Sequence, residues 1–156
     1  MLMAPPPLPP HEVAAVTIMP PTKPPKLVAS YPAEGQAVAP GVLILKLTFD
    51  QRMIATGFDI APAPGAEALD CVKTPRLLND DRTFVLLCRG LSGRSYALTF
   101  NAQPEGGFQN LAEKRAIPVT LSFTTTNTEP IRSLPEAMRV QNLSNLEVPV
   151  QESTKR

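Results

Sequence analysis

Residues 41–53 read GVLILKLTFDQRM and contain the clearest strand pattern in this chain of 156 residues. Apolar and polar side chains alternate through the second half of this stretch. A period of two is typical of a β-strand with one buried face and one face in contact with water. One face comprises Leu43, Leu45, Leu47 and Phe49, and the other comprises Lys46, Thr48 and Asp50. The stretch then ends in an acid, an amide and a base before Met53.

A similar strand-like composition extends from Lys26 to about Thr126. Short aliphatic and β-branched runs alternate with turn residues, at intervals typical of a sandwich or barrel. Seven strands are predicted, in the segments KLVAS, GVLILKLTF, FDIAP, ALDCVK, TFVLLC, YALTF and VTLSFTT. No segment of this region keeps a helical period, so the sequence predicts an all-β domain over residues 26–126.

Two segments of different composition flank this domain. Nine of the 19 prolines lie in residues 1–25, which we interpret as an extended Pro-rich arm or linker. A docking motif for a groove-bearing partner is the alternative. Residues 127–156 form a polar tail. In this tail Ser133 and Glu136 have the spacing of a capping box, which predicts a short helix ending near Gln141.

The order of these segments resembles the bacterial Ig-like domains of surface-layer proteins, adhesins and other envelope proteins. The resemblance covers roughly residues 24–126 and rests on four segments: PPKLVASYPAEGQAV, LILKLTFDQRM, RTFVLLCRGLSGRSYALTF and GFQNLAEKRAIPVTLSFTT. It implies an Ig-like Greek-key β-sandwich of about seven strands. Glu113-Lys114 departs from the Gly-Asn that often follows Leu-Ala in the last loop of the family, so we expect that turn to be remodelled.

The resemblance also assigns anchor residues. Phe49 and Met53 correspond to core anchors, and Leu91, Gly93 and Tyr96 correspond to the next corner of the fold. The polar residues between Phe49 and Met53 are then a solvated step where a strand leaves its sheet. Catalysis there would need a cleft and a partner base, and the sequence indicates neither.

Cys71 and Cys88 are a candidate disulfide. If LLNDDR forms a hairpin turn centred between Asn79 and Asp80, the two cysteines lie opposite each other and on the core side. Directly opposed residues of an antiparallel pair have Cα atoms about 4.5 or 5.5 Å apart, within reach of a disulfide. Two reduced, buried thiols are the alternative, and the cellular compartment decides between them.

The sequence argues against other chemistry. His11 is the only histidine and lies in the Pro-rich arm, so a Ser-His-Asp arrangement, a zinc site and a copper site of the periplasmic sandwich type all lack ligands. The aspartates have no calcium-loop spacing, and Gly106-Gly107 lacks the context of a phosphate loop. We expect no catalytic residues, no metal and no cofactor.

Composition limits the partners. The net charge of +1 and the absence of tryptophan disfavour nucleic acid and saccharides, and no apolar run approaches the ~20 residues of a membrane span. We therefore expect a non-enzymatic module of the bacterial cell envelope that acts as a spacer, adhesion or assembly domain through protein–protein contacts. Its partners would be unidentified proteins or neighbouring envelope domains. The segment EVAAVTIM (residues 12–19) is β-prone and could pair with a sheet edge of its own or a neighbouring domain.

Two alternatives remain: an accessory, substrate-positioning domain of a larger secreted enzyme, and a cytosolic or phage structural protein. The N-terminus has no positive region and no continuous apolar region, so it is not an ordinary signal peptide. We expect the periplasm, the cell surface or the exterior, with the cytoplasm as the alternative. An exposed aromatic row would favour the accessory domain, and free thiols would favour the cytosolic protein.

Overall fold

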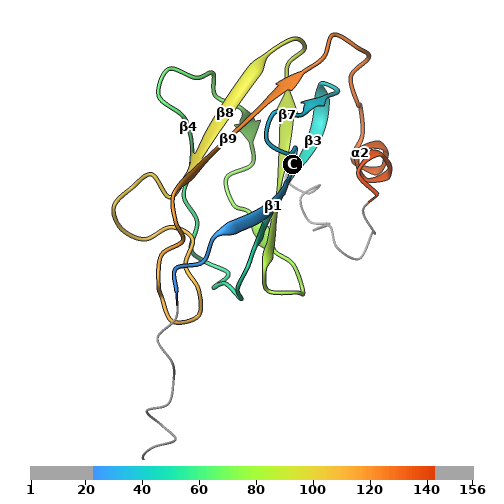
Figure 1. The fold of residues 1–156 in the computed structure, drawn as a ribbon. Helices are drawn as coiled ribbons and strands as arrows, with labels where there is room; N and C mark the ends of the chain where they lie inside the picture. The colour runs from blue at the N-terminus through green and yellow to red at the C-terminus, as the bar shows by residue number, and fades with distance from the viewer. Residues whose placement is uncertain (1–22, 143–156) are drawn as a thin grey trace, which may run out of the picture.

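The computed structural model describes residues 23–142 and shows a two-layered, nearly all-β fold, an Ig-like Greek-key β-sandwich (Figure 1). All seven predicted strands are present, together with two short additional ones. In chain order the strands are β1 (Leu27–Tyr31), β2 (Ala37–Val38), β3 (Gly41–Phe49), β4 (Ile60–Pro62), β5 (Asp70–Cys71), β6 (Arg76–Leu77), β7 (Thr83–Gly90), β8 (Ser95–Phe100) and β9 (Val119–Thr125).

The strands form two sheets. The first sheet has the order β1-β3-β7-β5, with β6 also paired to β7, and the second has the order β2-β9-β8-β4. All pairs are antiparallel except β2 with β9. The chain crosses between the layers after β1, β2, β3, β4 and β7, whereas β5, β6 and β7 stay in the first sheet and β8 and β9 stay in the second. Such a mixture of crossing and same-sheet connections is typical of Greek-key sandwiches.

The core lies between the two sheets and follows the predicted alternation of β3. Leu45 and Phe49 are buried, and Phe49 packs against the rings of Phe84 and Phe108 at centroid distances of 6.1 and 5.2 Å. Such aromatic contacts stabilise beyond the burial of their area. The buried members of this core are Val38, Leu43, Leu45, Leu47, Phe49, Met53, Phe84, Leu86, Cys88, Tyr96, Leu98, Phe100, Phe108, Ala116, Leu121 and Phe123.

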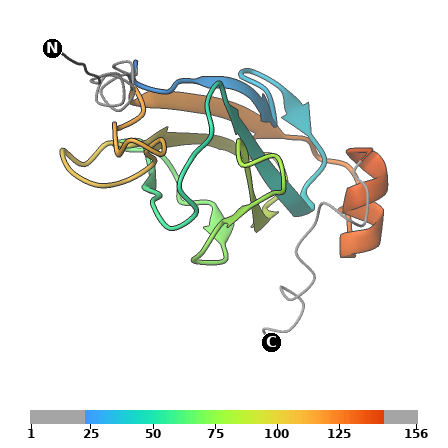
Figure 2. The same cartoon turned by 90° about the horizontal axis from the view of Figure 1, so that it is seen from below.

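A second apolar cluster lies on the outer face of the first sheet. The predicted helix is present as α2 (Leu134–Val140), and the Ser133 side chain caps it by accepting from the Glu136 N–H. Ala137 and Met138 of α2 pack with Ile44 and Val85 of the sheet. Figure 2 shows α2 outside the two layers rather than between them. A helix this short needs such docking, because it is not stable alone in water.

Candidate functional site: strand edges and the disulfide

The polar step after β3 is built into a network of contacts. Asp50 accepts a hydrogen bond from the Lys26 N–H at 3.0 Å, and Gln51 donates to the Lys23 carbonyl at 2.8 Å. Arg52 forms an exposed ion pair with Asp81 at 2.8 Å. These side chains are more than a solvated step, because two of them hold the chain where it enters β1.

Two of the residues assigned as anchors, Phe49 and Met53, are 2% exposed. Met53 also forms a bridge with Asn110, and its N–H donates to the Asp81 carbonyl at 2.7 Å. The backbone at this strand exit is therefore fixed on both sides of the polar step.

The corner before β8 depends on one tyrosine hydroxyl. The Leu91 N–H donates to the Tyr96 hydroxyl at 2.9 Å, and the Tyr96 ring is 2% exposed. Gly93 has φ of 65°, and a Cβ there would lie 2.6 Å from Asn127 Oδ1. Leu91 is 50% exposed, so it belongs to the corner through its backbone and is not a core residue.

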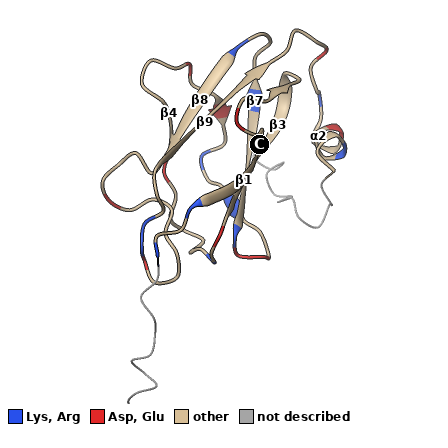
Figure 3. Cartoon of the chain, viewed as in Figure 1, with Lys and Arg blue, Asp and Glu red and all other residues tan. Residues whose placement is uncertain are grey.

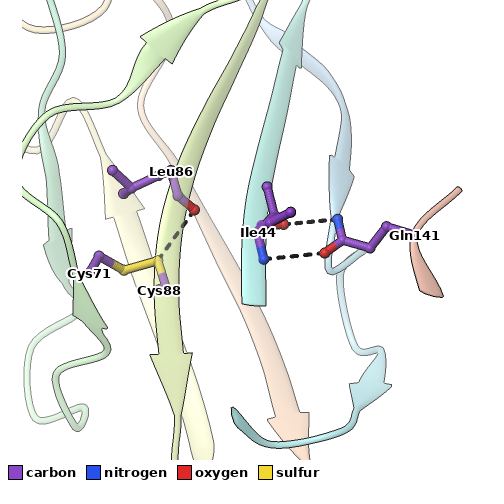
Figure 4. Close-up of a disulfide and its surroundings, with 5 residues drawn as sticks. All are labelled: Ile44, Cys71, Leu86, Cys88 and Gln141. Atoms are coloured by element: carbon purple, nitrogen blue, oxygen red, sulfur yellow. Dashed lines mark hydrogen bonds between the residues drawn. A yellow bond between two sulfur atoms is a disulfide. The ribbon is translucent and has the colours of Figure 1, made fainter. Parts of the chain in front are cut away.

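The disulfide joins β5 to β7, with a sulfur–sulfur distance of 2.05 Å and a Cα–Cα distance of 3.9 Å (Figure 4). Cys71 and Cys88 are directly opposed, as predicted, and Cys88 is buried in the core. The hairpin turn differs from the prediction. β6 pairs Arg76 with Val85, whereas the register of the cysteine pair, continued along the strand, would place residue 76 opposite residue 83. The pairing with β7 therefore shifts by two residues, because Lys73, Thr74 and Pro75 interrupt the strand.

The last loop keeps a tight turn despite its unusual sequence. Asn110 accepts hydrogen bonds from the Ala112 and Lys114 N–H groups, both at 2.9 Å. Glu113 adopts φ of 65°, the left-handed conformation that glycine favours. The turn at Glu113-Lys114 is therefore tight, with glutamate in a conformation that glycine favours.

Sequence reasoning did not locate a groove between β1 and β9, at one side of the sandwich. Its volume is about 410 Å³. Leu27 and Leu121 contribute apolar side chains, and Val28 is 54% exposed at the rim. β1 and β9 contain no charged residue, and Figure 3 accordingly draws the residues of both strands in tan. The lining residues are Leu27, Val28, Ala29, Ser30, Ala33, Glu34, Val119, Thr120 and Leu121.

The β1 side of this groove is a sheet edge. Asp50 donates to the Lys26 carbonyl, and Ala29 lies opposite Thr48 in the pairing with β3. Because hydrogen bonding alternates along an antiparallel pair, the N–H and C=O of Ser30 point away from β3. Within residues 23–142 no strand pairs with this side of β1.

The first half of β9 is a second edge on the same groove. The Thr125 N–H donates to Arg94 beside β8, whereas the Thr124 N–H donates to the Gln36 carbonyl on the opposite side. The same alternation directs the N–H and C=O of Thr120 away from β8. In the described part of the chain, β2 pairs with β9 only at Thr124 and Thr125, so no strand lies beside Thr120 on this side.

Hydrogen-bonded backbone bounds both ends of the groove. The Gly35 N–H donates to the Ser122 carbonyl at 2.7 Å, and the Ser122 N–H donates to the Glu34 carboxylate at 2.9 Å. At the other end Pro25 is buried, and its carbonyl accepts from the Ile117 N–H at 2.9 Å. The groove is therefore bounded at both ends and is open along the side between β1 and β9.

A second groove, of about 390 Å³, lies between β4 and β5 beside the disulfide. Its apolar wall includes Ile60, Leu69 and Cys71, and Lys73 and Asp59 contribute charge. β4 and β5 are three and two residues long, so they offer little backbone for pairing with another strand. The groove between β1 and β9 is the better candidate site.

Two shifted pKa values belong to a residue of β1 and to a residue of the turn before β7. Burial raises the pKa of Tyr31, at the end of β1. For Asp80, partial burial acts to raise the pKa. Hydrogen bonds from the Thr83 hydroxyl and from the Arg82 and Thr83 N–H groups, together with the Arg82 charge, lower the pKa by more than burial raises it. The net pKa of Asp80 is therefore below its usual value. Asp80 is a turn residue outside both grooves, as its sequence context predicted.

The described part of the chain, residues 23–142, contains no group of three histidine, cysteine or carboxylate side chains that could hold a metal ion. It also contains no helix of the length and hydropathy needed to cross a bilayer. His11 and residues 12–19, together with most of the arm and the end of the tail, lie outside the described residues.

Comparison with known proteins gives structural likeness only. No protein-family model matches the sequence, and no curated protein sequence matches it. CopC from Methylosinus trichosporium OB3b is similar in structure, with 20% identity and a TM-score of 0.47 over 69% of this chain and 98% of that one. The S-layer protein rSbsC(31-844) is similar with 18% identity and a TM-score of 0.46, over 70% of this chain and 14% of that one. At this level of likeness, we infer function from the residues of this chain alone.

Proposed function

We propose that this chain is a non-enzymatic Ig-like module of the bacterial cell envelope that binds another protein by accepting an extended segment in the groove between β1 and β9. The observation that carries the proposal is that two strand edges, at Ser30 and Thr120, face one groove between strands that carry no charge. An added strand gains main-chain hydrogen bonds from such an edge, and side-chain pockets give it specificity.

The disulfide supports a location in the periplasm, at the cell surface or outside the cell. Disulfides persist in oxidising compartments and are rare in the reducing cytosol. The Cys71–Cys88 bond therefore disfavours the cytosolic or phage structural protein as an alternative. It closes a separation of 17 residues, and such a bond stabilises by roughly 3 kcal/mol in the chain-entropy account.

The aromatic residues disfavour the accessory, saccharide-positioning domain. All six phenylalanines and both tyrosines lie within residues 23–142, and none of them is exposed. Stacking on a sugar requires an aromatic face at the surface. The protein-binding groove therefore remains the better supported function.

A photo-crosslinking amino acid at Val28 in the native host tests this function. Val28 is exposed at the rim of the groove, and Ser95 on β8 is an exposed control position away from it. We expect a protein adduct from position 28 and none from position 95. The adduct should disappear in Ser30→Pro, which removes the outward N–H, and persist in Ser30→Ala. No adduct at position 28, or equal adducts at both positions, would contradict the proposal.

A further inference from the structure

We propose that residues 12–19, EVAAVTIM, of a second copy of this chain occupy the groove between β1 and β9. This inference rests on the proposed function, because it names the occupant of the same groove. Copies of the protein would then associate by exchanging their N-terminal arms.

The composition of this segment suits the groove. Seven of its eight residues carry no charge, and Val13, Val16, Thr17 and Ile18 are β-branched residues that favour strands. The groove strands are also uncharged, and the side chains of Leu27 and Leu121 offer apolar contacts. An apolar strand can therefore enter without burying an unpaired charge.

Proline limits the paired region on both sides of the segment. Pro10 precedes it and Pro20 follows it. Because proline lacks the N–H that a strand ladder needs, pairing ends at these positions. A short strand bounded in this way matches a groove that is bounded at one end by Gly35 and Ser122 and at the other by Pro25 and Ile117.

The attachment of the arm favours a neighbouring copy over its own domain. Gln51 holds the Lys23 carbonyl at 2.8 Å, and Ile117 holds the Pro25 carbonyl, so the entry of the chain into β1 is fixed. To reach its own groove, the segment would have to reverse direction between Met19 and Leu27. Four of the residues between them are prolines, which favour an extended course of about 3.1 Å per residue.

The arm also enters the domain at one end of the groove. Pro25, whose carbonyl accepts from the Ile117 N–H at that end, precedes Leu27, a lining residue, and the other end lies near Ser122. Two copies placed with their arm ends together can each present an arm to the groove of the other. Reciprocal exchange of an identical element is a low-cost route to a closed pair.

Cysteine crosslinking of the full chain tests the occupant. We would prepare Thr17→Cys and Val28→Cys as separate variants and mix them under mild oxidation that preserves the native disulfide. We expect a disulfide-linked heterodimer between the two variants. A mixture of Thr17→Cys with Ser95→Cys should give at least tenfold less product. A synthetic peptide of residues 10–21 should reduce the heterodimer by competition.

Sedimentation velocity provides an independent measurement. Wild-type protein and Ser30→Ala should associate, whereas Ser30→Pro should sediment as a monomer with an unchanged circular dichroism spectrum. If Ser30→Pro does not fold, Thr120→Pro removes the outward N–H from the other wall and should give the same monomer.

The outcomes separate this inference from the proposed function. Efficient crosslinking within single chains of a Thr17→Cys/Val28→Cys double variant would place the segment in its own groove and overturn the exchange. Absence of any crosslink would also overturn it. In either case, an adduct of another protein at Val28 in the host would leave the proposed function standing. Loss of that adduct as well would contradict both.

Discussion

The side-chain amide of Gln141 hydrogen-bonds to both backbone groups of Ile44, accepting from its N–H at 3.2 Å and donating to its C=O at 3.0 Å (Figure 4). β1 pairs with β3 only as far as Lys46, so the first half of β3 has no neighbouring strand on that side among the described residues. The Gln141 amide takes the place of a strand there. Two residues earlier on the same edge of β3, the Ile131 carbonyl also takes the place of a neighbouring strand, because it accepts from the Val42 N–H at 2.9 Å.

Gln141→Ala should open this edge locally. The substitution leaves the Ile44 N–H without its acceptor and removes the contact that fixes the end of α2. We expect hydrogen exchange at the Ile44 amide to accelerate by about tenfold, corresponding to roughly 1–1.5 kcal/mol for a lost hydrogen bond. Exchange at buried amides of β8 should not change. Arg139→Ala, on the exposed side of α2, is the control, and equal acceleration there would contradict this role of Gln141.

Tyr96→Phe should destabilise the whole sandwich. The substitution keeps the buried ring and removes only the hydroxyl that accepts from the Leu91 N–H. We expect the free energy of unfolding in urea to fall by about 1–2 kcal/mol, because a backbone donor loses its partner at a corner of the fold.

Thr99→Val is the matched control for this change. It removes a hydroxyl on the exposed face of β8 that contacts only the Thr120 hydroxyl at 3.3 Å. We expect it to alter the unfolding free energy by less than about 0.5 kcal/mol. If Tyr96→Phe changed the unfolding free energy as little as Thr99→Val does, the corner would not depend on this hydrogen bond.

Glu113→Gly should stabilise the protein. Glu113 holds φ of 65°, and the left-handed conformation costs a residue with a Cβ about 1–2 kcal/mol. Glycine avoids that cost but loses roughly 0.5–1 kcal/mol of chain entropy on folding. We therefore expect a net gain of about 0.5 kcal/mol in thermal or chemical unfolding. Ala112→Gly, at a neighbour without positive φ, should destabilise, and a loss of stability in Glu113→Gly would refute this account.

The sequence alone predicted the strands and the cysteine register because both follow from local alternation. Leu45 and Phe49 mark the core face of β3, and the parity of Cys71 and Cys88 places both thiols on one side. The short helix was also predicted, because Ser133 and Glu136 form a local cap. These features need no knowledge of the rest of the chain.

The groove could not be predicted in this way. It depends on where β1 stops pairing, on the short contact of β2 with the end of β9, and on the side to which Ser30 and Thr120 direct their backbone groups. These are long-range relations between strands, and alternation within one strand does not encode them. The two-residue change of register after Cys71 was missed for the same reason, since it arises from an interruption inside one expected strand.

Asp80 should make a contribution to stability that disappears in acid. Its carboxylate accepts from the Arg82 and Thr83 N–H groups, both at 2.9 Å, and from the Thr83 hydroxyl at 2.6 Å. The folded pKa lies below the unfolded value, so this contribution is full above about pH 4 and is lost as the pH falls through the folded pKa. Asp80→Ala should lower the unfolding free energy by about 1–2 kcal/mol at pH 7, and the deficit should shrink below pH 4. Asp80→Asn keeps an oxygen acceptor without a charge. If the deficit of Asp80→Ala stayed constant from pH 7 to pH 2, the charge on Asp80 would not be the source of the effect.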